Sequence, residues 1–367
     1  MHEMLAAVAH APHTPVEIKT LRLDDPRPNE LVVKVQASGI CHSDLSGRDQ
    51  HYPFSLPGVL GHEGAGMVVD VGTAVEGFAI GDRVIMSQAF CGQCEACRSG
   101  RVNVCPHAST MALQGTRSDG SALITDEAGN VISGAFLGQS SWATHAIVRE
   151  PNVVRIDDDL PWEVAAPLAC GVQTGAGAVF NLVDPDVSTS VVIFGAGAVG
   201  LGAVMAARYA GAGDVIVADP QAHRLALARE LGATHTFDPT AEDAVGYVLD
   251  VTRGGANFVL EASGALRAGP LAARCLERSG TLVLLGVPPY GTKIELDWVS
   301  LVSGQTVLGR PFGGGTPRDT IRALLKMRAA GALPLERLIH TYAFDDINQA
   351  ITDMESGVAI KPVLLCA

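Results

Sequence analysis

The sequence predicts an α/β protein with two domains, a largely β domain and a domain built on a doubly wound parallel sheet. Two patterns in the chain predict this fold class. Short strand-like runs separated by glycine turns occur along the chain up to Val148, which is typical of a β-rich domain. From Trp162 onward, apolar strands alternate with helical segments, which indicates a parallel sheet with crossover helices. A length of 367 residues is sufficient for two such domains.

Composition and charge narrow the class of protein and argue against two kinds of partner. Hydrophobic residues make up 47% of the chain and charged residues 18%, as in an ordered globular protein. The net charge of −13 disfavours binding to a phosphate backbone, so no nucleic acid partner is expected. The most apolar run, residues 191–207, is shorter than the roughly 20 residues of a membrane span, so no membrane partner is expected either.

The N-terminal segment has no basic stretch followed by an apolar one, so a secretory signal is not expected and the predicted location is cytoplasmic. In that reducing compartment, the eight cysteines are expected to be thiols that can act as ligands rather than disulfides. The positions of these cysteines therefore indicate candidate metal sites.

The β-rich domain is expected to contain strands with β-branched residues or period-two alternation. Turn residues bound these runs, as Pro28, Asn29 and Gly39 do for the first of them. The expected strands cover residues 30–37, 66–72, 82–86 and 143–148.

The second half of the chain is expected to begin with two Ala/Gly-rich helices and then to alternate strand and helix. The expected helices cover residues 162–169, 174–180, 224–231 and 270–276, with a further helix that ends at Tyr209. The expected strands cover residues 190–194, 215–219, 235–237, 258–261 and 281–286. A helix at residues 320–330 and a terminal strand at residues 361–365 complete the pattern.

Two stretches near the start of the chain carry donors for a metal ion. Cys41 is followed closely by Asp44, and His62 is followed by Glu63. A thiolate and an imidazole are strong zinc ligands, but a catalytic zinc needs a third protein ligand and an open fourth position. Cys170, close to the start of the predicted cofactor domain, is the best third ligand by its position in the chain.

A second group of cysteines has the spacing Cys-x-x-Cys-x-x-Cys, with a fourth cysteine after seven further residues. Four thiolates at this spacing predict a closed tetrahedral zinc site with a structural role, because no position is left for water. An iron–sulfur cluster is the alternative, but polar neighbours such as Glu95 and Arg98 would shield a cluster poorly. The four residues are Cys91, Cys94, Cys97 and Cys105.

A glycine-rich turn directly follows the strand at residues 190–194 and opens a helix. In this turn Gly195 permits the tight bend, Gly197 lets a pyrophosphate approach the backbone, and Gly200 allows close strand–helix packing. Asp219 ends the next strand, where a carboxylate accepts hydrogen bonds from ribose hydroxyls and repels a 2′-phosphate, so NAD is favoured over NADP. A packing turn without a ligand is the alternative interpretation.

Together these motifs resemble those of the zinc-dependent medium-chain alcohol dehydrogenase family over essentially the whole chain. The resemblance depends on the residues around His62, the four clustered cysteines, Cys170, the glycine turn and Asp219. It implies a GroES-like, β-rich catalytic domain from residues 1–171 and 312–367 and a Rossmann NAD-binding domain from residues 172–311. It also implies two zinc ions per chain and NAD as cofactors.

The resemblance further assigns roles at the catalytic zinc. Cys41, His62 and Cys170 would hold the metal, with Glu63 beside it and Asp44 orienting His62. The implied reaction is the reversible, NAD-linked oxidation of a primary alcohol to the aldehyde, by hydride transfer from a zinc-bound alkoxide.

Contacts with NAD are implied outside the glycine turn as well. For Arg224, a solvated helix face is an alternative interpretation. The implied contacts are His42 near the pyrophosphate, Thr174 near the nicotinamide, Val199 behind its ring, Arg224 near the adenosine ribose and Lys361 as a second cationic contact.

The proton path and the substrate pocket depart from the family pattern. Ser43 is expected to pass the alcohol proton outward, although a simple turn serine is the alternative. Many relatives have a histidine where this chain has Ser46, so the path would end in water or at His51. Ser87 is small where several relatives have an aromatic residue, which indicates a roomier pocket. The candidate pocket walls are Phe136 and Leu137.

The segments at residues 136–146 and 170–178 are similar to the aryl- and allylic-alcohol branch of the family, which includes benzyl-alcohol and geraniol dehydrogenases. An aryl or allylic alcohol is therefore the predicted substrate. The alternatives are an S-(hydroxymethyl)glutathione (formaldehyde) dehydrogenase of the same family and a nucleotide-binding protein of this fold without catalysis. The segment from Ile294 to Leu308, predicted to be strand-rich, is the expected interface of a homodimer or homotetramer.

Overall fold

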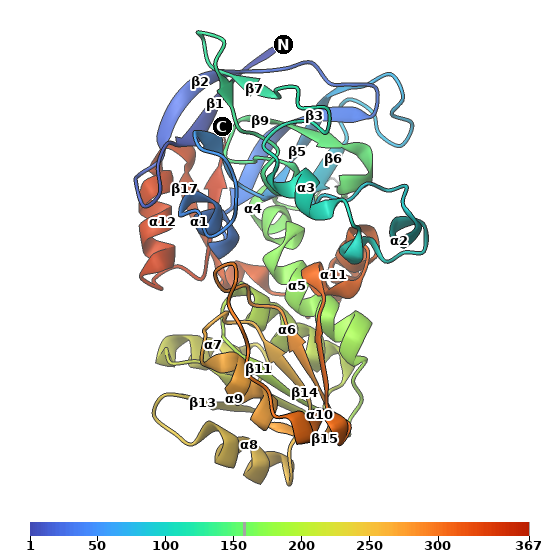
Figure 1. The fold of residues 1–367 in the computed structure, drawn as a ribbon, viewed down its shortest axis with the longest axis vertical. Helices are drawn as coiled ribbons and strands as arrows, with labels where there is room; N and C mark the ends of the chain where they lie inside the picture. Colours follow the sequence, from blue (N-terminus) through green and yellow to red (C-terminus); the bar gives the residue numbers. More distant parts are fainter. Residues whose placement is uncertain (157–158, 367) are drawn as a thin grey trace. The chain divides into compact units, whose positions relative to one another are not determined.

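The computed structural model describes residues 1–156 and 159–366, and the chain divides into two units (Figure 1). Unit 1 consists of Met1–Cys170, Thr316–Ile321 and Leu335–Ala367, and unit 2 consists of Gly171–Gly315 and Arg322–Pro334. The first division lies one residue from the predicted boundary at residue 171. Residues 312–315 and 322–334, predicted to lie in the catalytic domain, belong to unit 2 instead.

The strands of unit 1 form two sheets. They are β1 (His2–Ala9), β2 (Glu17–Leu23), β3 (Glu30–Gly39), β4 (Gly58–Val59), β5 (Glu63–Val71), β6 (Arg83–Met86), β7 (Ile124–Thr125), β8 (Val131–Ile132), β9 (His145–Arg149), β10 (Val153–Arg155), β17 (Ile339–Ala343) and β18 (Lys361–Leu365). One sheet has the order β4-β1-β2-β7-β8, and the other has the order β10-β6-β5-β3-β18-β17 with β9 also paired to β3. Because β18 pairs antiparallel with β3, the end of the chain folds with its beginning.

Short helices connect the strands of unit 1. They are α1 (His42–Arg48), α2 (Glu95–Arg98), α3 (Ala108–Leu113), α4 (Trp162–Ala165) and α12 (Ile347–Glu355), with the 3₁₀ segments η1 (Val102–Val104), η2 (Phe136–Gly138), η3 (Glu150–Asn152), η4 (Ala166–Ala169), η7 (Leu335–Arg337) and η8 (Phe344–Asp346). The β-rich character and the strands expected at residues 30–37, 66–72, 82–86, 143–148 and 361–365 are confirmed, with small differences at their ends.

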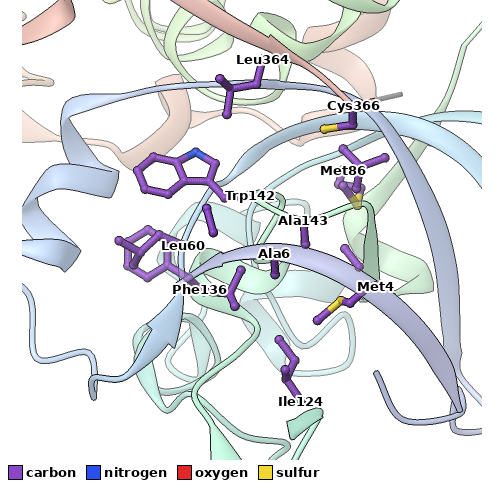
Figure 2. Close-up of a cluster of buried hydrophobic side chains, with 14 of the residues drawn as sticks. Met4, Ala6, Leu60, Met86, Ile124, Phe136, Trp142, Ala143, Leu364 and Cys366 are labelled. Atoms are coloured by element: carbon purple, nitrogen blue, oxygen red, sulfur yellow. The ribbon is translucent and has the colours of Figure 1, made fainter. Parts of the chain in front are cut away.

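The core of unit 1 lies under the stretch that carries His62. Trp142 and Phe136 are among the largest side chains that are fully buried, and their burial removes a large apolar area from water. Figure 2 shows both beside Leu60, which precedes His62 by two residues. The backbone of Leu60 also accepts a hydrogen bond from the N–H of Trp142. This packing fixes the backbone from which the His62 side chain projects.

Unit 2 contains a parallel sheet with the strand order β13-β12-β11-β14-β15-β16. The order reverses between β11 and β14, as the doubly wound prediction requires. All residues of β11 are buried, which explains its continuous apolar sequence. The strands are β11 (Ser190–Phe194), β12 (Asp214–Ala218), β13 (His235–Phe237), β14 (Ala256–Glu261), β15 (Leu276–Leu284) and β16 (Thr306–Gly309).

The helices of unit 2 alternate with its strands as predicted, but two of them, at residues 244–252 and 298–302, were not predicted. They are α5 (Gly171–Ala178), which continues into the π-helical segment η5 (Val179–Val183), α6 (Ala198–Ala210), α7 (Ala222–Glu230), α8 (Ala244–Thr252), α9 (Ala268–Arg274), α10 (Trp298–Val302) and the 3₁₀ segment η6 (Pro311–Gly314). Helix α11 (Pro317–Ala329) contains the division between the units. Within residues 1–156 and 159–366, no single helix is long and apolar enough to span a membrane. One bent pair of helices meets this requirement, by length and composition only.

The prediction of a strand-rich segment from Ile294 to Leu308 is wrong in its first half. This part of the chain forms helix α10, and only β16 is a strand. The reason is local, because the carboxylate of Asp297 accepts a hydrogen bond from the N–H of Ser300 at 2.7 Å and so caps the helix. Strand β16 forms the edge of the sheet.

Candidate active site and metal centres

The first metal donor, Cys41, stands immediately before helix α1. Its N–H donates to the carboxylate of Asp44 at 2.9 Å, and this contact closes the first turn of the helix. Asp44 is fully buried. Its other oxygen accepts from the N–H of Gly61 at 3.1 Å and lies 2.6 Å from Nδ1 of His62. Asp44 therefore fixes Cys41 and His62 together, which matches the orienting role predicted for it.

The His62 ring is held so that one nitrogen is left for a metal ion. With Nδ1 bound to Asp44, the buried Nε2 has no hydrogen-bond partner among the residues that the structure describes. Phe136 packs against the ring with its centroid 6.1 Å away. Burial alone would lower the pKa of His62, but the Asp44 carboxylate raises it well above its ordinary value. A metal ion at Nε2 would replace the proton that this pKa implies.

The structure brings Cys41, His62, Glu63 and Cys170 together in unit 1, with one ligand atom of each within 4.8 Å of the others. A hydrogen bond from the Cys170 thiol lowers the pKa of Cys41 well below its ordinary value, although burial opposes the shift. The same contact raises the pKa of Cys170 well above its ordinary value. A thiolate that shares a proton with a second thiol, beside an unpartnered imidazole nitrogen, is a donor set that fits zinc.

Glu63 belongs to this cluster but already has a partner. Both of its carboxylate oxygens accept from Nζ of the buried Lys361, at 2.9 and 2.7 Å. Burial raises the pKa of Glu63 to about 7, even though Lys361 opposes the shift. Lys361 also donates to the backbone oxygen of Ile40 at 3.1 Å. The ion pair occupies the Glu63 carboxylate, so Cys41, His62 and Cys170 are the donors without a competing cation. The contact predicted between Lys361 and the cofactor stays a prediction.

The residues predicted for the proton path and the pocket lie around this cluster. Ser43 is the second residue of α1 and is half-buried. Ser87 is buried at the end of β6, and its hydroxyl donates to the backbone oxygen of Ala169, the neighbour of Cys170, at 3.2 Å. Leu137 is half-buried and Phe136 has no exposed surface. Direct contact of these four residues with a substrate stays a prediction.

One residue near the cluster was missed by the sequence prediction. The hydroxyl of Tyr52 forms a hydrogen bond with the Ser43 side chain, and the pKa of Tyr52 is raised to about 12, chiefly by burial. The backbone N–H of Tyr52 donates to the oxygen of Ser46 at 3.0 Å, which folds the segment after α1 back over the helix. No motif marks a tyrosine in such a loop, so only the fold reveals it. By contrast, His51 is exposed.

The four clustered cysteines form a second group of donors, all within 4.8 Å of one another. Their sulfurs lie 3.8 Å apart for Cys91 and Cys97, 3.9 Å for Cys94 and Cys105, and 3.6 Å for Cys91 and Cys105. A tetrahedral zinc with bonds of about 2.3 Å would hold its sulfurs about 3.8 Å apart. The geometry therefore fits a closed zinc site. Backbone N–H groups of Gln93 and Cys94 help to lower the pKa of Cys91 to about 6, against the effect of burial.

The glycine turn of unit 2 has the geometry that dinucleotide binding requires. Gly195 has a φ of +99°, and a side chain on Gly200 would meet the oxygen of Gly195 at 1.8 Å. At Gly197, the residue before α6, a side chain would meet nothing within 4 Å. The space above Gly197 and the N-terminus of a 13-residue helix suit a pyrophosphate.

Asp219 is tied to this turn. One oxygen of its carboxylate accepts from the N–H of Ala196 and the other from the N–H of Gln221, both at 2.8 Å. The residue is 4% exposed and directly follows β12. The carboxylate therefore lies beside the glycine turn at the carboxyl end of the sheet, where a dinucleotide ribose is bound in this fold.

The other predicted cofactor contacts are distributed over both units. Thr174 on α5 and Val199 on α6 belong to helices of unit 2 that pack closely, because a side chain on Gly175 would meet the oxygen of Val199 at 1.8 Å. Arg224 on α7 is half-buried, and its Nε has no hydrogen-bond partner among the residues described. In unit 1, His42 is exposed at the start of α1. Their contacts with NAD stay predictions.

Replacing Asp219 with serine is expected to raise KM for NAD at least about tenfold and to improve the use of NADP. Hydrogen bonds to a charged group contribute about 1.5–3 kcal/mol, and the repulsion of a 2′-phosphate disappears with the carboxylate. Initial rates with both cofactors measure the change. Asp214→Ser, at the other end of the same strand, is the matched control. An unchanged preference would show that Asp219 does not contact the ribose.

Comparisons with known proteins agree with this geometry. Residues 27–158 match the family model described as alcohol dehydrogenase GroES-like domain, and residues 198–330 match the model described as zinc-binding dehydrogenase. A geraniol dehydrogenase of Castellaniella defragrans is 40% identical over 98% of this chain and 97% of its own length. An S-(hydroxymethyl)glutathione dehydrogenase of Paracoccus denitrificans is 32% identical over 98% and 99%. The crystal structure of benzyl alcohol dehydrogenase from Acinetobacter calcoaceticus superposes with a TM-score of 0.96 at 38% identity, with 100% of both chains covered.

Proposed function

The chain belongs to the zinc-dependent medium-chain alcohol dehydrogenase family, and from this premise we propose that it oxidises primary aryl or allylic alcohols reversibly to aldehydes with NAD. One observation carries the proposal. Cys41, His62 and Cys170 converge in unit 1 while Lys361 occupies the carboxylate of Glu63. Three donors with an open fourth position are typical of catalytic zinc sites.

The protein's own residues hold and orient the reacting groups. When bound, zinc would act as a Lewis acid that lowers the pKa of the alcohol and polarises the aldehyde. Asp44 keeps the His62 ring in the tautomer that presents Nε2. The Ser43 hydroxyl accepts the alcohol proton as it donates its own to the Tyr52 hydroxyl, and the half-buried Tyr52 passes its phenolic proton on to water. Glu63 and Lys361 remain paired, so neither adds an uncompensated charge to the cluster.

Replacing Tyr52 with phenylalanine is expected to lower the rate of alcohol oxidation about tenfold or more, because positioned proton transfer contributes roughly 100- to 10,000-fold and solvent can replace part of it. The solvent deuterium isotope effect on kcat should change with it. Tyr342→Phe is the control, since its hydroxyl donates to Asp353 at 2.7 Å on the far strand β17. Equal rates for wild type and Tyr52→Phe would remove Tyr52 from the proton path.

The substrate class is supported by the chain and by its relatives. The side chain of Ser87 is buried beside Ala169, the neighbour of Cys170, and it is smaller than the aromatic residue that several relatives have at this position. Relatives at 40% and 38% identity are named geraniol and benzyl alcohol dehydrogenases. Both names denote alcohols with an unsaturated or aromatic carbon next to the carbinol carbon, which stabilises the positive charge that develops there as hydride leaves.

An alcohol panel with NADH absorbance as the readout tests the proposal. Benzyl alcohol, cinnamyl alcohol and geraniol are expected to give the highest kcat/KM, with ethanol at least about 100-fold lower, a difference of roughly 2.7 kcal/mol in transition-state binding. Binding of NAD without turnover of any alcohol would favour a non-catalytic protein of this fold.

A second candidate, oxidation of S-(hydroxymethyl)glutathione, is favoured by the relative of that name at 32% identity. The two candidates differ in the charge of the substrate, because the glutathione adduct carries two carboxylates and an ammonium group. Activity with S-(hydroxymethyl)glutathione but not with benzyl alcohol, measured under one condition, would make oxidation of S-(hydroxymethyl)glutathione the proposed function instead.

We further propose that the chain forms a homodimer or homotetramer in the cytoplasm through the segment from Ile294 to Leu308. Trp298 and Val302 on α10 are 80% and 76% exposed, and the adjacent β16 is an edge strand. Large exposed apolar side chains beside an unpaired strand edge are suited to self-association. Sedimentation equilibrium of wild type and Trp298→Lys tests this interface, and an unchanged mass would place the contact elsewhere.

A further inference from the structure

Strands β5 and β6 separate at the metal cluster, and a side-chain amide stands where they part. Their antiparallel ladder pairs Met67 with Arg83, Gly66 with Val84 and Ala65 with Ile85. The next pair would be Gly64 with Met86, but no such pairing occurs. From there β5 leads back to His62 and β6 leads on to Ser87.

Gln139 occupies this position. Its Oε1 accepts from the N–H of Gly64 at 3.0 Å, and its Nε2 donates to the oxygen of Met86 at 3.0 Å. Nε2 also donates to the oxygen of His62 at 2.7 Å and lies 3.5 Å from the oxygen of Ser87. The side chain is 2% exposed, and every polar atom of its amide is bonded. The amide thus replaces a peptide group between the two strands and binds the backbone of a metal ligand.

The segment that presents Gln139 is itself constrained. Ala135, Leu137 and Ser140 have φ angles of +52°, +48° and +61°, in the left-handed region that residues with a side chain rarely adopt. The Ser140 hydroxyl donates to the oxygen of Val59 at 2.6 Å and accepts from the N–H of Phe136 at 2.9 Å. A segment in this conformation persists only where its surroundings fix it, and Gln139 is one of its anchors.

The point where β5 and β6 separate, here called the fork, has no space for a side chain at residue 64. A side chain at Gly64 would meet the methyl carbon of Met86 at 2.2 Å and Oε1 of Gln139 at 3.1 Å. The glycine therefore lets the two strands and the amide approach one another. His62 is held at two points, its ring by Asp44 and its backbone by Gln139.

We infer that Gln139 is a positioning residue of the catalytic metal site. Its amide bridges the separated ends of β5 and β6 and so determines the positions of His62 and Ser87. This inference rests on the proposed function, because His62 is the metal ligand only if that function is correct. Gln139 acts through the backbone of the ligand and through the end of β6.

Gln139→Met is the test variant, since it keeps the length of the side chain and removes both the donor and the acceptor. One zinc per chain is expected to be lost at least about tenfold faster to a chelator, within the 10- to 100-fold effect typical of groups that orient metal ligands. The other zinc, held by the four clustered cysteines, should leave at the wild-type rate. After exchange to Co²⁺, the absorption bands of the catalytic site should shift, which a loss of global stability alone would not produce.

Gln139→Glu distinguishes the effect of the amide donor from that of the acceptor oxygen. It also serves as the test variant if Gln139→Met does not fold. It keeps an oxygen for the N–H of Gly64 but loses the amide donor to His62 and Met86, so faster zinc loss in this variant assigns the effect to the donor. Gln114→Met is the matched control, because the half-buried Gln114 also donates to two oxygens, those of Thr116 and Arg117.

Wild-type zinc kinetics and an unshifted cobalt spectrum in Gln139→Met and Gln139→Glu would overturn the inference and leave the proposed function intact. A wild-type protein that holds a single zinc per chain and oxidises no alcohol would overturn both. Faster zinc loss in Gln114→Met to the same extent would also overturn it, since the effect would then not be specific to the fork.

Discussion

Replacing Cys170 with alanine is expected to reduce the zinc content from two ions to one per chain and to lower kcat/KM for alcohol oxidation at least about a thousandfold. A thousandfold loss corresponds to about 4 kcal/mol of transition-state stabilisation. The physical reason is that Cys41 and His62 alone do not complete a zinc site, and the Cys170 thiol, which is hydrogen-bonded to the Cys41 thiolate, is the third donor of the cluster. Metal analysis of protein purified without chelator and initial rates with benzyl alcohol measure both effects.

Two further variants make this result specific. Cys366→Ala removes another buried thiol of unit 1 that lies outside both clusters, and it should keep two zinc ions and wild-type rates. Asp44→Ala keeps all three ligand residues but removes the carboxylate that fixes Cys41 and the His62 ring, so zinc affinity should fall about 10- to 100-fold. Retention of both zinc ions in Cys170→Ala would remove this residue from the metal site.

Replacing Cys105 with serine is expected to release the other zinc and to unfold its lobe locally. The buried residues that support this lobe are few, namely Phe90, Val102 and two of the cysteines themselves. Such a small core supplies little stability without its metal, because metal binding and folding are coupled in sites of this kind. Limited proteolysis should cut between residues 91 and 113 at least about tenfold faster, which corresponds to roughly 1.4 kcal/mol of local stability.

The catalytic donors lie outside this lobe in the sequence, so Cys105→Ser should retain one zinc ion and measurable activity at low temperature. The control is Cys275→Ala, which removes a thiol from the core of unit 2 and should leave the lobe resistant to protease. A lobe that stays resistant in Cys105→Ser, with one zinc lost, would mean that its backbone is held without the metal.

The parts of this protein that a sequence predicts well are those with local signatures. The glycine turn is one, because the spacing predicts a separate steric requirement for glycine at each of its three positions. In the structure, Gly195 and Gly200 fulfil these requirements, the first by its positive φ and the second by close packing. The four clustered cysteines are another. They lie within 15 residues of one another, so they can bind one metal ion without contacts from distant parts of the chain. The alternation of apolar strand and helix likewise predicts the parallel sheet of unit 2.

The parts that escaped prediction depend on contacts between distant segments. Lys361 pairs with Glu63 across 298 positions, and Gln139 binds the backbone of His62 across 77. No local pattern distinguishes such a buried lysine or glutamine from one on the surface. Helix α10 is a different case, because Asp297 is a helix-capping residue followed by apolar residues, and this signal was present in the sequence.

The distribution of the cysteines has a practical consequence. Six of the eight belong to the two donor clusters, and the remaining two, Cys275 and Cys366, are buried with pKa values raised to about 12 by burial. Alkylating reagents attack thiolates, so the metal-loaded protein offers them almost no reactive thiol, whereas chelation exposes the cysteines of both clusters. A count of the thiols that react at neutral pH should therefore measure how much metal the protein holds, and oxidative damage should begin in molecules that have lost it.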